Sequence, residues 1–295
     1  MAKIIWLASY PKSGNTWVRA FLTAYFYGRV NINTMADTQS AAGRDIIDRF
    51  SGVRSATLAP PQAHSLRPEV YRRLAAAPAR NGLPALLKVH DLYQATIMGE
   101  PMFPAEATHA TVYIVRHPLD AAVSFAHHLG FTMEQIANTI CHETFTLGLR
   151  GPSTRLQLPQ RIASWRTHVA SWLDQTALPI ILVKYEDLVA KPTETFTAML
   201  KAMGFAVPGA TDLAGTEDEK LRAHIEAAVK ATSFAALQAQ ELVGRFREKS
   251  RRARDSSFFR KGKVGGWQEE MPATIAKKIS DYNAPMMLRL GYQTL

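Results

Sequence analysis

The chain has 295 residues, 47% of them hydrophobic, which suffices to bury one large core and does not require two domains. Its 35 lysine and arginine residues outnumber its 25 acidic residues, and the resulting formal charge of +10 favours polyanionic ligands. The single cysteine, Cys141, excludes an internal disulfide and is expected to be a small buried side chain.

Apolar runs and metal-ligand spacing argue against two further classes of protein. No uninterrupted apolar stretch approaches the ~18 residues that span a bilayer, and the run at residues 4–8 is too short for the core of a signal peptide. His127, His128 and His142 lie near Cys141 without a recognised zinc spacing. We therefore expect a soluble, cytoplasmic protein with no membrane span and no metal.

Residues 4–17 combine a buried strand with a loop suited to phosphate. Residues 4–8 form a continuous apolar run, and Tyr10-Pro11 ends it before a helical apolar stripe begins. The loop between them contains Lys12, Ser13, Gly14, Asn15 and Thr16. A helix start offers backbone N–H groups and the positive end of a dipole. The Walker A pattern is absent, and an ordinary capped strand-to-helix turn explains these residues equally well.

A second apolar run, at residues 110–115, ends at an arginine. The planar fork of Arg116 can hold a phosphate group at the carboxyl end of a parallel strand. Pro118 suits the first turn of the following helix, on which Ser124 lies. The alternative is a surface ion pair between Arg116 and Asp120.

A third run, at residues 84–87, leads through Lys88 to His90. Imidazole can accept a proton from a hydroxyl group near neutral pH, and its position after a strand suits a catalytic base. A lone histidine is more often structural, so both interpretations stay open on this pattern alone.

The stretch 245–263 is strongly basic. Its first part, 245–254, has the composition of a solvated charge run. Arg260, Lys261 and Gly262 differ, because aromatic residues precede them and glycines follow them. Such a loop can present N–H groups to an anion and close over it.

Four strand candidates alternate with helical patterns, at residues 4–8, 84–88, 111–115 and 180–184. This alternation predicts a single α/β domain with a central parallel sheet and helices on both faces. Helical spacing predicts one core-facing helix with the stripe Leu158, Ile162, Trp165, Val169 and Trp172. Pro192 and Gly204 bound another helix, and Thr216 with Glu219 predicts a capping box.

The motifs together resemble a known family. SYPKSGNTW is similar to the YPKSGTTW segment of sulfotransferases that use 3′-phosphoadenosine 5′-phosphosulfate (PAPS). LLKVHDL, VRHPLDAAVSF and FFRKGKVGGW resemble the family's catalytic-base segment, its 3′-phosphate segment and its RKGxxGDW signature, in the same order. The resemblance covers nearly the whole chain and implies a P-loop-like fold.

The resemblance implies a role for each motif. His90 would be the base, with Lys12 and Lys88 stabilising the charge that develops during transfer. The donor's 5′-phosphosulfate would be held by Lys12, Ser13, Gly14, Asn15 and Thr16. The 3′-phosphate would be held by Arg116, Ser124, Arg260, Lys261 and Gly262. Trp17, Tyr185, Thr232 and Phe234 are implied at the adenine, although core packing explains the three aromatic side chains nearly as well.

Several positions depart from the family pattern. Asn15 stands where threonine is usual, Asp91-Leu92 follows His90, and Gly266 and Gln268 replace an aspartate and a lysine of the C-terminal signature. The family's dimerisation pattern is not matched across residues 268–277, so a dimer formed by that route is not expected.

Three segments, 31–61, 131–159 and 244–264, are interpreted as variable or mobile parts that shape the acceptor pocket or cover the donor. The chain is therefore predicted to transfer a sulfuryl group from PAPS to a hydroxyl group, without a nucleic-acid partner and on an acceptor that the sequence does not identify. Two alternatives are a P-loop-type kinase or NTPase using ATP and magnesium, and a non-enzymatic protein that binds nucleotides or polyanions.

Overall fold

The computed structural model describes residues 3–33, 35, 38–78, 82–149, 155–205, 216–244, 246, 248–249 and 257–295. A five-stranded parallel sheet lies at the centre, in the order β2-β3-β1-β4-β7. The strands are β1 (Ile4–Ser9), β2 (Thr38–Ser40), β3 (Ala85–Val89), β4 (Thr108–Val115) and β7 (Ile180–Lys184). The four predicted strands are confirmed. The edge strand β2 was not predicted, because its three residues are polar and carry no apolar pattern.

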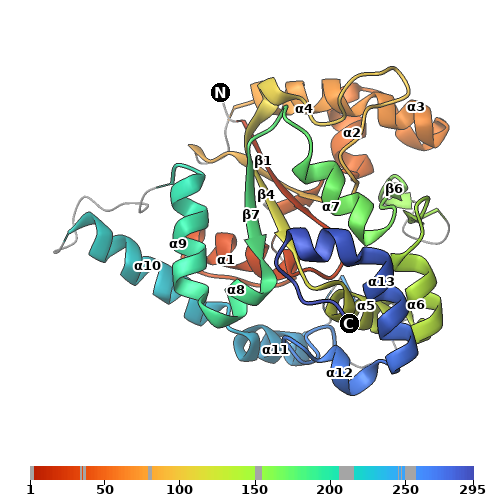
Figure 1. Cartoon of the computed structure of the whole chain (residues 1–295). Helices are drawn as coiled ribbons and strands as arrows, with labels where there is room; N and C mark the ends of the chain where they lie inside the picture. The colour runs from red at the N-terminus through yellow and green to blue at the C-terminus, as the bar shows by residue number, and fades with distance from the viewer. Residues whose placement is uncertain are drawn as a thin grey trace.

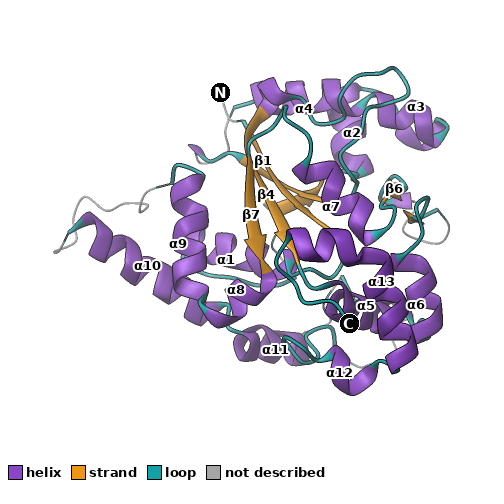
Figure 2. Cartoon of the chain, in the orientation of Figure 1, coloured by secondary structure: helices purple, strands orange, loops and turns teal. Residues whose placement is uncertain are grey.

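Helices pack on both faces of this sheet (Figures 1 and 2). One face is covered by α1 (Asn15–Tyr27), α8 (Tyr185–Ala190), α9 (Pro192–Ala202) and α10 (Glu217–Ala231). The other face is covered by α4 (Arg67–Ala76), α5 (Pro118–Leu129), α6 (Met133–Ile140), α7 (Trp165–Leu173) and α13 (Ala273–Arg289). The predicted α/β architecture with helices on both faces is confirmed.

Shorter elements surround these two layers. They are α2 (Arg44–Ser51), α3 (Pro60–Ser65), α11 (Phe234–Val243), α12 (Trp267–Glu270) and the two-stranded antiparallel pair β5 (Thr146–Leu147) and β6 (Gln160–Arg161). Thus segment 31–61 contains β2, α2 and the start of α3, whereas 131–159 contains α6 and β5. Thr34, Ala36 and Asp37 of the first segment and residues 150–154 of the second lie outside the described residues.

Strand β1 shows why the sheet forms where the apolar runs lie. Trp6 packs into the apolar layer on the α7 side, and its neighbours Ile5 and Leu7 pack into the layer on the α1 side. All three side chains are fully buried. A strand covered on both faces has no polar face, which explains its continuous apolar sequence.

The predicted helix boundaries are mostly correct. Pro118 and Pro192 occupy the first turns of α5 and α9, and Gly204 follows the end of α9 with φ 76°. The backbone N–H of Thr216 donates to Glu219 Oε2 at 2.8 Å, as the capping-box prediction requires.

The helix predicted over residues 158–172 is shorter than predicted. It begins at Trp165, because Ser164 Oγ caps it by accepting a hydrogen bond from the Thr167 N–H at 3.2 Å. Leu158 and Ile162 are buried, as expected, but they lie before the helix. Their helical spacing therefore reflects burial in a loop and not a helical turn.

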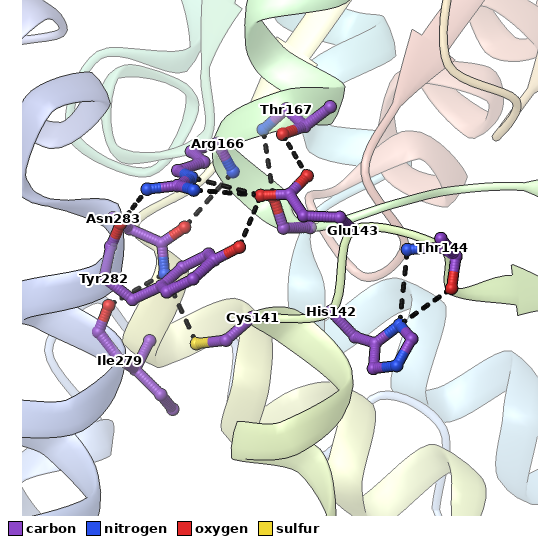
Figure 3. Close-up of polar contacts among 10 residues, drawn as sticks. Cys141, His142, Glu143, Thr144, Arg166, Thr167, Ile279, Tyr282 and Asn283 are labelled. Carbon is purple, nitrogen blue, oxygen red and sulfur yellow. Dashed lines mark hydrogen bonds and ion pairs between the residues drawn. The ribbon is translucent and has the colours of Figure 1, made fainter.

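A polar cluster attaches residues 141–144 to the helices of the α7 side. Figure 3 shows Glu143 accepting hydrogen bonds from Arg166, Thr167 and Tyr282, which belong to α7 and α13. The Arg166 guanidinium also lies 4.0 Å from the centroid of the Tyr282 ring. The chain that follows α6 is thereby fixed to two other helices.

Cys141 belongs to the same region and corrects one expectation. The side chain is half-buried and not fully buried, with Asn283 Nδ2 4.0 Å from its sulfur (Figure 3). Burial nevertheless raises the pKa of the Cys141 thiol to about 11.

No helix in the described part of the chain is both long and apolar enough to cross a membrane.

Candidate active site

The parallel strands end at one edge of the sheet, and a cavity of about 700 Å³ lies there. Open parallel sheets bind ligands at this edge. With the exception of Ser13, every site residue predicted from the sequence lines the cavity. The lining residues among those predicted are Lys12, Gly14, Asn15, Thr16, Trp17, Lys88, His90, Arg116, Ser124, Tyr185, Thr232, Phe234, Arg260, Lys261 and Gly262. Ser13 is fully buried within the loop after β1, and its hydroxyl has no hydrogen-bond partner among the described residues.

The loop after β1 requires glycine at its turn. Gly14 precedes the first residue of α1 with φ 105°, which L side chains rarely adopt. A Cβ atom at this position would lie 2.7 Å from Cδ2 of Tyr185, so the absence of a side chain also lets that ring approach. The start of α1 therefore faces the cavity with bare backbone beside an aromatic ring.

Asn15 joins this loop to the strand before it. Its Nδ2 donates to the Leu7 carbonyl at 2.8 Å and to Ser9 Oγ at 3.2 Å. Asn15 thus stabilises the loop, although it stands where the similar family usually has threonine. The residue remains compatible with an anion-binding turn.

Lys12 is the first cation of the cavity. Its Nζ lies 3.6 Å from the centroid of the Phe258 ring. Burial, together with the nearby positive charges of Arg116 and Lys88, lowers the pKa of Lys12 to about 7, although Glu248 opposes the shift. Lys12 is therefore a cation that an additional negative charge in the cavity would stabilise.

His90 is fixed in one tautomer by its neighbours. Its Nδ1 lies 2.9 Å from the Ser9 carbonyl, which can only accept, so Nδ1 carries the proton and Nε2 carries the lone pair. On the other side, His168 Nε2 donates to the His90 carbonyl at 3.0 Å. Burial and the charge of Lys88 hold the pKa of His90 well below 6.5, which keeps the imidazole neutral.

Two charged residues at the site were not predicted: Glu248, which lines the cavity, and Arg19, which contacts it from α1. Arg19, on α1, has Nη2 2.7 Å from Glu248 Oε1, and Glu248 Oε2 lies 3.4 Å from Lys88 Nζ. Arg19 is the only charged residue of α1, which was the available signal. Glu248 had none, because it lies in a charge run interpreted as solvated.

Arg116 bridges two loops of the cavity. Its Nη1 donates to the Lys12 carbonyl at 3.3 Å and its Nη2 to the Lys263 carbonyl at 3.0 Å. Its guanidinium carbon lies 4.2 Å from the centroid of the Tyr185 ring. The side chain thus connects the loop after β1 with the C-terminal basic loop.

Asp120 is not the partner of Arg116 that the alternative interpretation required. Its carboxylate instead accepts from the N–H groups of Gly265 at 2.7 Å and Trp267 at 3.1 Å. These bonds tie α5 to the C-terminal signature at the place where its usual aspartate is replaced by Gly266. Asp120 therefore fixes the backbone of residues 265–267 to α5.

The side chains of the C-terminal basic loop are paired with acids of α12. Arg260 Nη1 lies 2.8 Å from Glu270, and Lys261 Nζ lies 2.9 Å from both Glu269 and Glu270. Although burial opposes ionisation, these cations and His127 hold the pKa of Glu270 at about 2. The loop is therefore fixed by ion pairs at its base.

Gly262 brings this loop against the predicted adenine side. It has φ 62°, and a Cβ atom there would overlap the ring of Phe234. Nearby, Trp17 and Tyr185 pack edge to face with their centroids 6.2 Å apart, and the Thr232 hydroxyl donates to the Ala228 carbonyl at 2.7 Å. The cavity is thus closed at this end by aromatic rings and a glycine turn.

The other wall of the cavity contains apolar residues from α5 and from the segments beside β5 and β6. They are Val123, Phe125, Leu129, Leu147, Leu156 and Leu158, with His128, Gln157 and Gln160 among them.

Most of the basic run 245–254 lies outside the described residues, which include only Phe246, Glu248 and Lys249 of it. Within the described part of the chain, no group of three or more histidine, cysteine or acidic residues could hold a metal ion.

Fold and site together define an α/β protein with a P-loop-like turn and a cation-lined cavity at the carboxyl edge of its sheet. The chain belongs to the sulfotransferase family: the model of the sulfotransferase domain matches residues 3–291. Cytosolic sulfotransferase 13 of Arabidopsis thaliana is 25% identical over 182 residues, which span 57% of this chain and 48% of the plant protein. The match therefore covers about half the length of that relative.

Two solved structures are similar in fold. Mouse sulfotransferase SULT7A1 complexed with PAP has a TM-score of 0.55 at 17% identity, covering 97% of this chain and 84% of the mouse chain. Retinol dehydratase in complex with retinol and PAP has a TM-score of 0.58 at 17% identity, covering 97% and 82% of the two chains. At such identities the likeness establishes the fold.

Proposed function

We propose that this protein transfers a sulfuryl group from PAPS to a hydroxyl group of an acceptor. The observation that carries the proposal is the cavity that unites the loop after β1, His90, Arg116 and the loop 260–262. Membership of the sulfotransferase family and the PAP complexes of two structural relatives support the same donor. PAP is adenosine 3′,5′-bisphosphate, the form of the donor that remains after transfer.

The residues fit a nucleotide with a phosphate group at each end. The loop at residues 12–17 offers the positive end of α1 and a lysine to the 5′-phosphosulfate. Arg116 and Ser124, with the loop 260–262, line the cavity where they can hold the 3′-phosphate. The buried Nε of Arg116 lacks a partner among the described residues, as expected of a group that binds a ligand.

The adenine is assigned to the aromatic end of the cavity. Trp17, Tyr185 and Phe234 offer ring surfaces there, and Thr232 lies beside them. The glycines at 14 and 262 allow Tyr185 and Phe234 to approach the two loops. A nucleotide held by both loops would present only its 5′-phosphosulfate to the acceptor hydroxyl. Fixing the two reactants in this orientation lowers the activation barrier of the transfer.

His90 accepts the proton of the acceptor hydroxyl in this proposal. Its Nδ1–H donates to the Ser9 carbonyl, which leaves the lone pair of Nε2 to act as the base. PAPS supplies a sulfuryl group bonded to a phosphate leaving group. Lys12 and Lys88 stabilise the negative charge that develops as that group leaves, in a cavity where burial strengthens electrostatic interactions.

The test uses PAPS labelled in its sulfur, a panel of hydroxylated acceptors and a native cell extract. The wild-type protein should label an acceptor, and His90→Ala should abolish labelling while binding PAP nearly as the wild type does. His109→Ala is the matched control, because His109 lies near the start of β4, away from the strand ends that form the cavity, and contacts the Met203 carbonyl. Labelling by His90→Ala at the wild-type rate would remove His90 from the mechanism.

A further inference from the structure

A carboxylate lies among the cations of the cavity. Glu248 contacts Arg19 at 2.7 Å and Lys88 at 3.4 Å, and its side chain is 31% exposed. Both cations are more deeply buried, with side-chain exposures of 3% and 19%. The charge of Glu248 also acts on the pKa values of Lys12 and His128. Glu248 therefore connects Lys88, which lines the cavity, with the more deeply buried Arg19.

Arg19 faces the phosphate-binding loop from within α1. It lies one turn beyond Thr16, and its Nη2 is 3.2 Å from the Thr16 hydroxyl. Its Nε is buried and has no hydrogen-bond partner among the described residues. A buried guanidinium is costly unless its donors are satisfied, so Glu248 meets only part of what Arg19 can bind.

The pair Arg19–Glu248 has a chemical equivalent in the donor. A carboxylate presents two oxygens to the arginine fork, and phosphate or sulfonate oxygens are bound by the same donor geometry. Lys88 contributes a point charge that suits any of these anions. The groups that hold Glu248 are therefore also groups that would hold the terminal oxyanion of PAPS.

We propose that Arg19 and Lys88 form the subsite for the donor's sulfonate group, and that Glu248 occupies this subsite until the donor displaces its carboxylate. The inference rests on the proposed function. The contact of Arg19 with Thr16 assigns the subsite to the donor and not to an acidic group of the acceptor, because Thr16 lies in the first turn of α1, directly after the loop that follows β1.

Glu248 then distinguishes the donor from the spent nucleotide. PAPS must displace the carboxylate to place its sulfonate, whereas PAP lacks that group and leaves Glu248 in contact with Arg19 and Lys88. Glu248 returns to the subsite once the sulfuryl group has left with the acceptor. A residue outside the four family motifs thus affects the relative affinity for PAPS and PAP.

The experiment measures the dissociation constants of PAPS and PAP by calorimetry without acceptor. Glu248→Gln retains the shape of the side chain and removes its charge, so PAPS should bind about tenfold tighter relative to PAP than in the wild type. Arg19→Met should weaken PAPS about tenfold relative to PAP, and Arg19→Lys should fall between. Glu226→Gln, which removes an exposed ion-pair partner on α10, should leave the ratio unchanged.

Three outcomes would overturn the inference. Proportional changes for PAPS and PAP in the Arg19 variants would mean that Arg19 only supports the fold of the loop. If the ratio of the PAPS and PAP dissociation constants is unchanged in Glu248→Gln, the subsite binds an anion other than the sulfonate. If PAPS binds more weakly to that variant, Glu248 only holds Lys88 in position. Failure of the wild type to bind either nucleotide would instead reject the proposed function.

Discussion

Replacing Gly14 by alanine tests the structure of the phosphate-binding loop. An alanine at a left-handed backbone position costs about 1–2 kcal/mol. At Gly14 the new Cβ would also lie 2.7 Å from Tyr185 Cδ2, whereas ordinary contacts begin at 3.4 Å. The ring or the loop must therefore retreat by about 0.7 Å, and such overpacking costs a further 1–3 kcal/mol or so.

Gly28→Ala provides the matched control. Gly28 ends the same helix with φ 67°, and a Cβ atom there would have nothing within 4 Å. This variant should pay only the backbone cost of about 1–2 kcal/mol. The difference between the two variants isolates the contact of Gly14 with Tyr185 from the effect of the backbone angle.

Calorimetry with PAP and urea unfolding measure the two effects. Gly14→Ala should weaken PAP at least about tenfold, which is about 1.4 kcal/mol, because Tyr185 and the loop both line the cavity. Gly28→Ala should bind PAP as the wild type does, with a lower free energy of unfolding. Wild-type affinity in Gly14→Ala would refute the claim that this loop and ring contact the nucleotide.

Three further outcomes are expected. Near pH 8 a Lys12 with a pKa of about 7 is largely neutral, so the protein should take up protons when PAP binds, and it should take up fewer near pH 6. Calorimetry in buffers of different ionisation enthalpy measures this uptake, and Lys12→Met should abolish it. Asp120→Ala should weaken PAP several-fold in calorimetry by releasing Gly265 and Trp267, and unchanged affinity would contradict this role. Arg67→Met should lower the free energy of unfolding in urea by about 3–5 kcal/mol, because it leaves the fully buried Asp91 carboxylate unpaired, and Arg67→Met with Asp91→Leu should recover much of that loss.

The sequence predicted the parallel sheet because its central strands are apolar on both faces. The runs ending near Ser9, Val89, Val115 and Lys184 each became a strand of the sheet. The edge strand β2 escaped prediction, since a short polar strand is defined by its neighbour β3 and not by its own residues. Local pattern is informative where burial is complete and fails at the edges.

The same limit applies to the site. Lys12, His90 and Arg116 follow strand ends, which made them candidates because parallel strands deliver their carboxyl ends to one edge, and the family resemblance then implied their roles. Glu248 and Asp120 contact residues more than a hundred positions away, so only the folded chain brings these charges into the site. The start of the helix predicted from Leu158 was wrong, because buried residues before α7 can imitate helical spacing.

Calorimetry of the wild-type protein tests directly whether the cavity holds a nucleotide by two phosphate groups. The titrations compare PAP with adenosine 5′-monophosphate, which lacks the 3′-phosphate, and with ATP and magnesium. One PAP should bind per chain, and the other two ligands should bind at least about tenfold more weakly, since Arg116 and the loop 260–262 would lose the 3′-phosphate. Equal affinity for PAP and the monophosphate, or a preference for ATP with magnesium, would contradict this mode of binding.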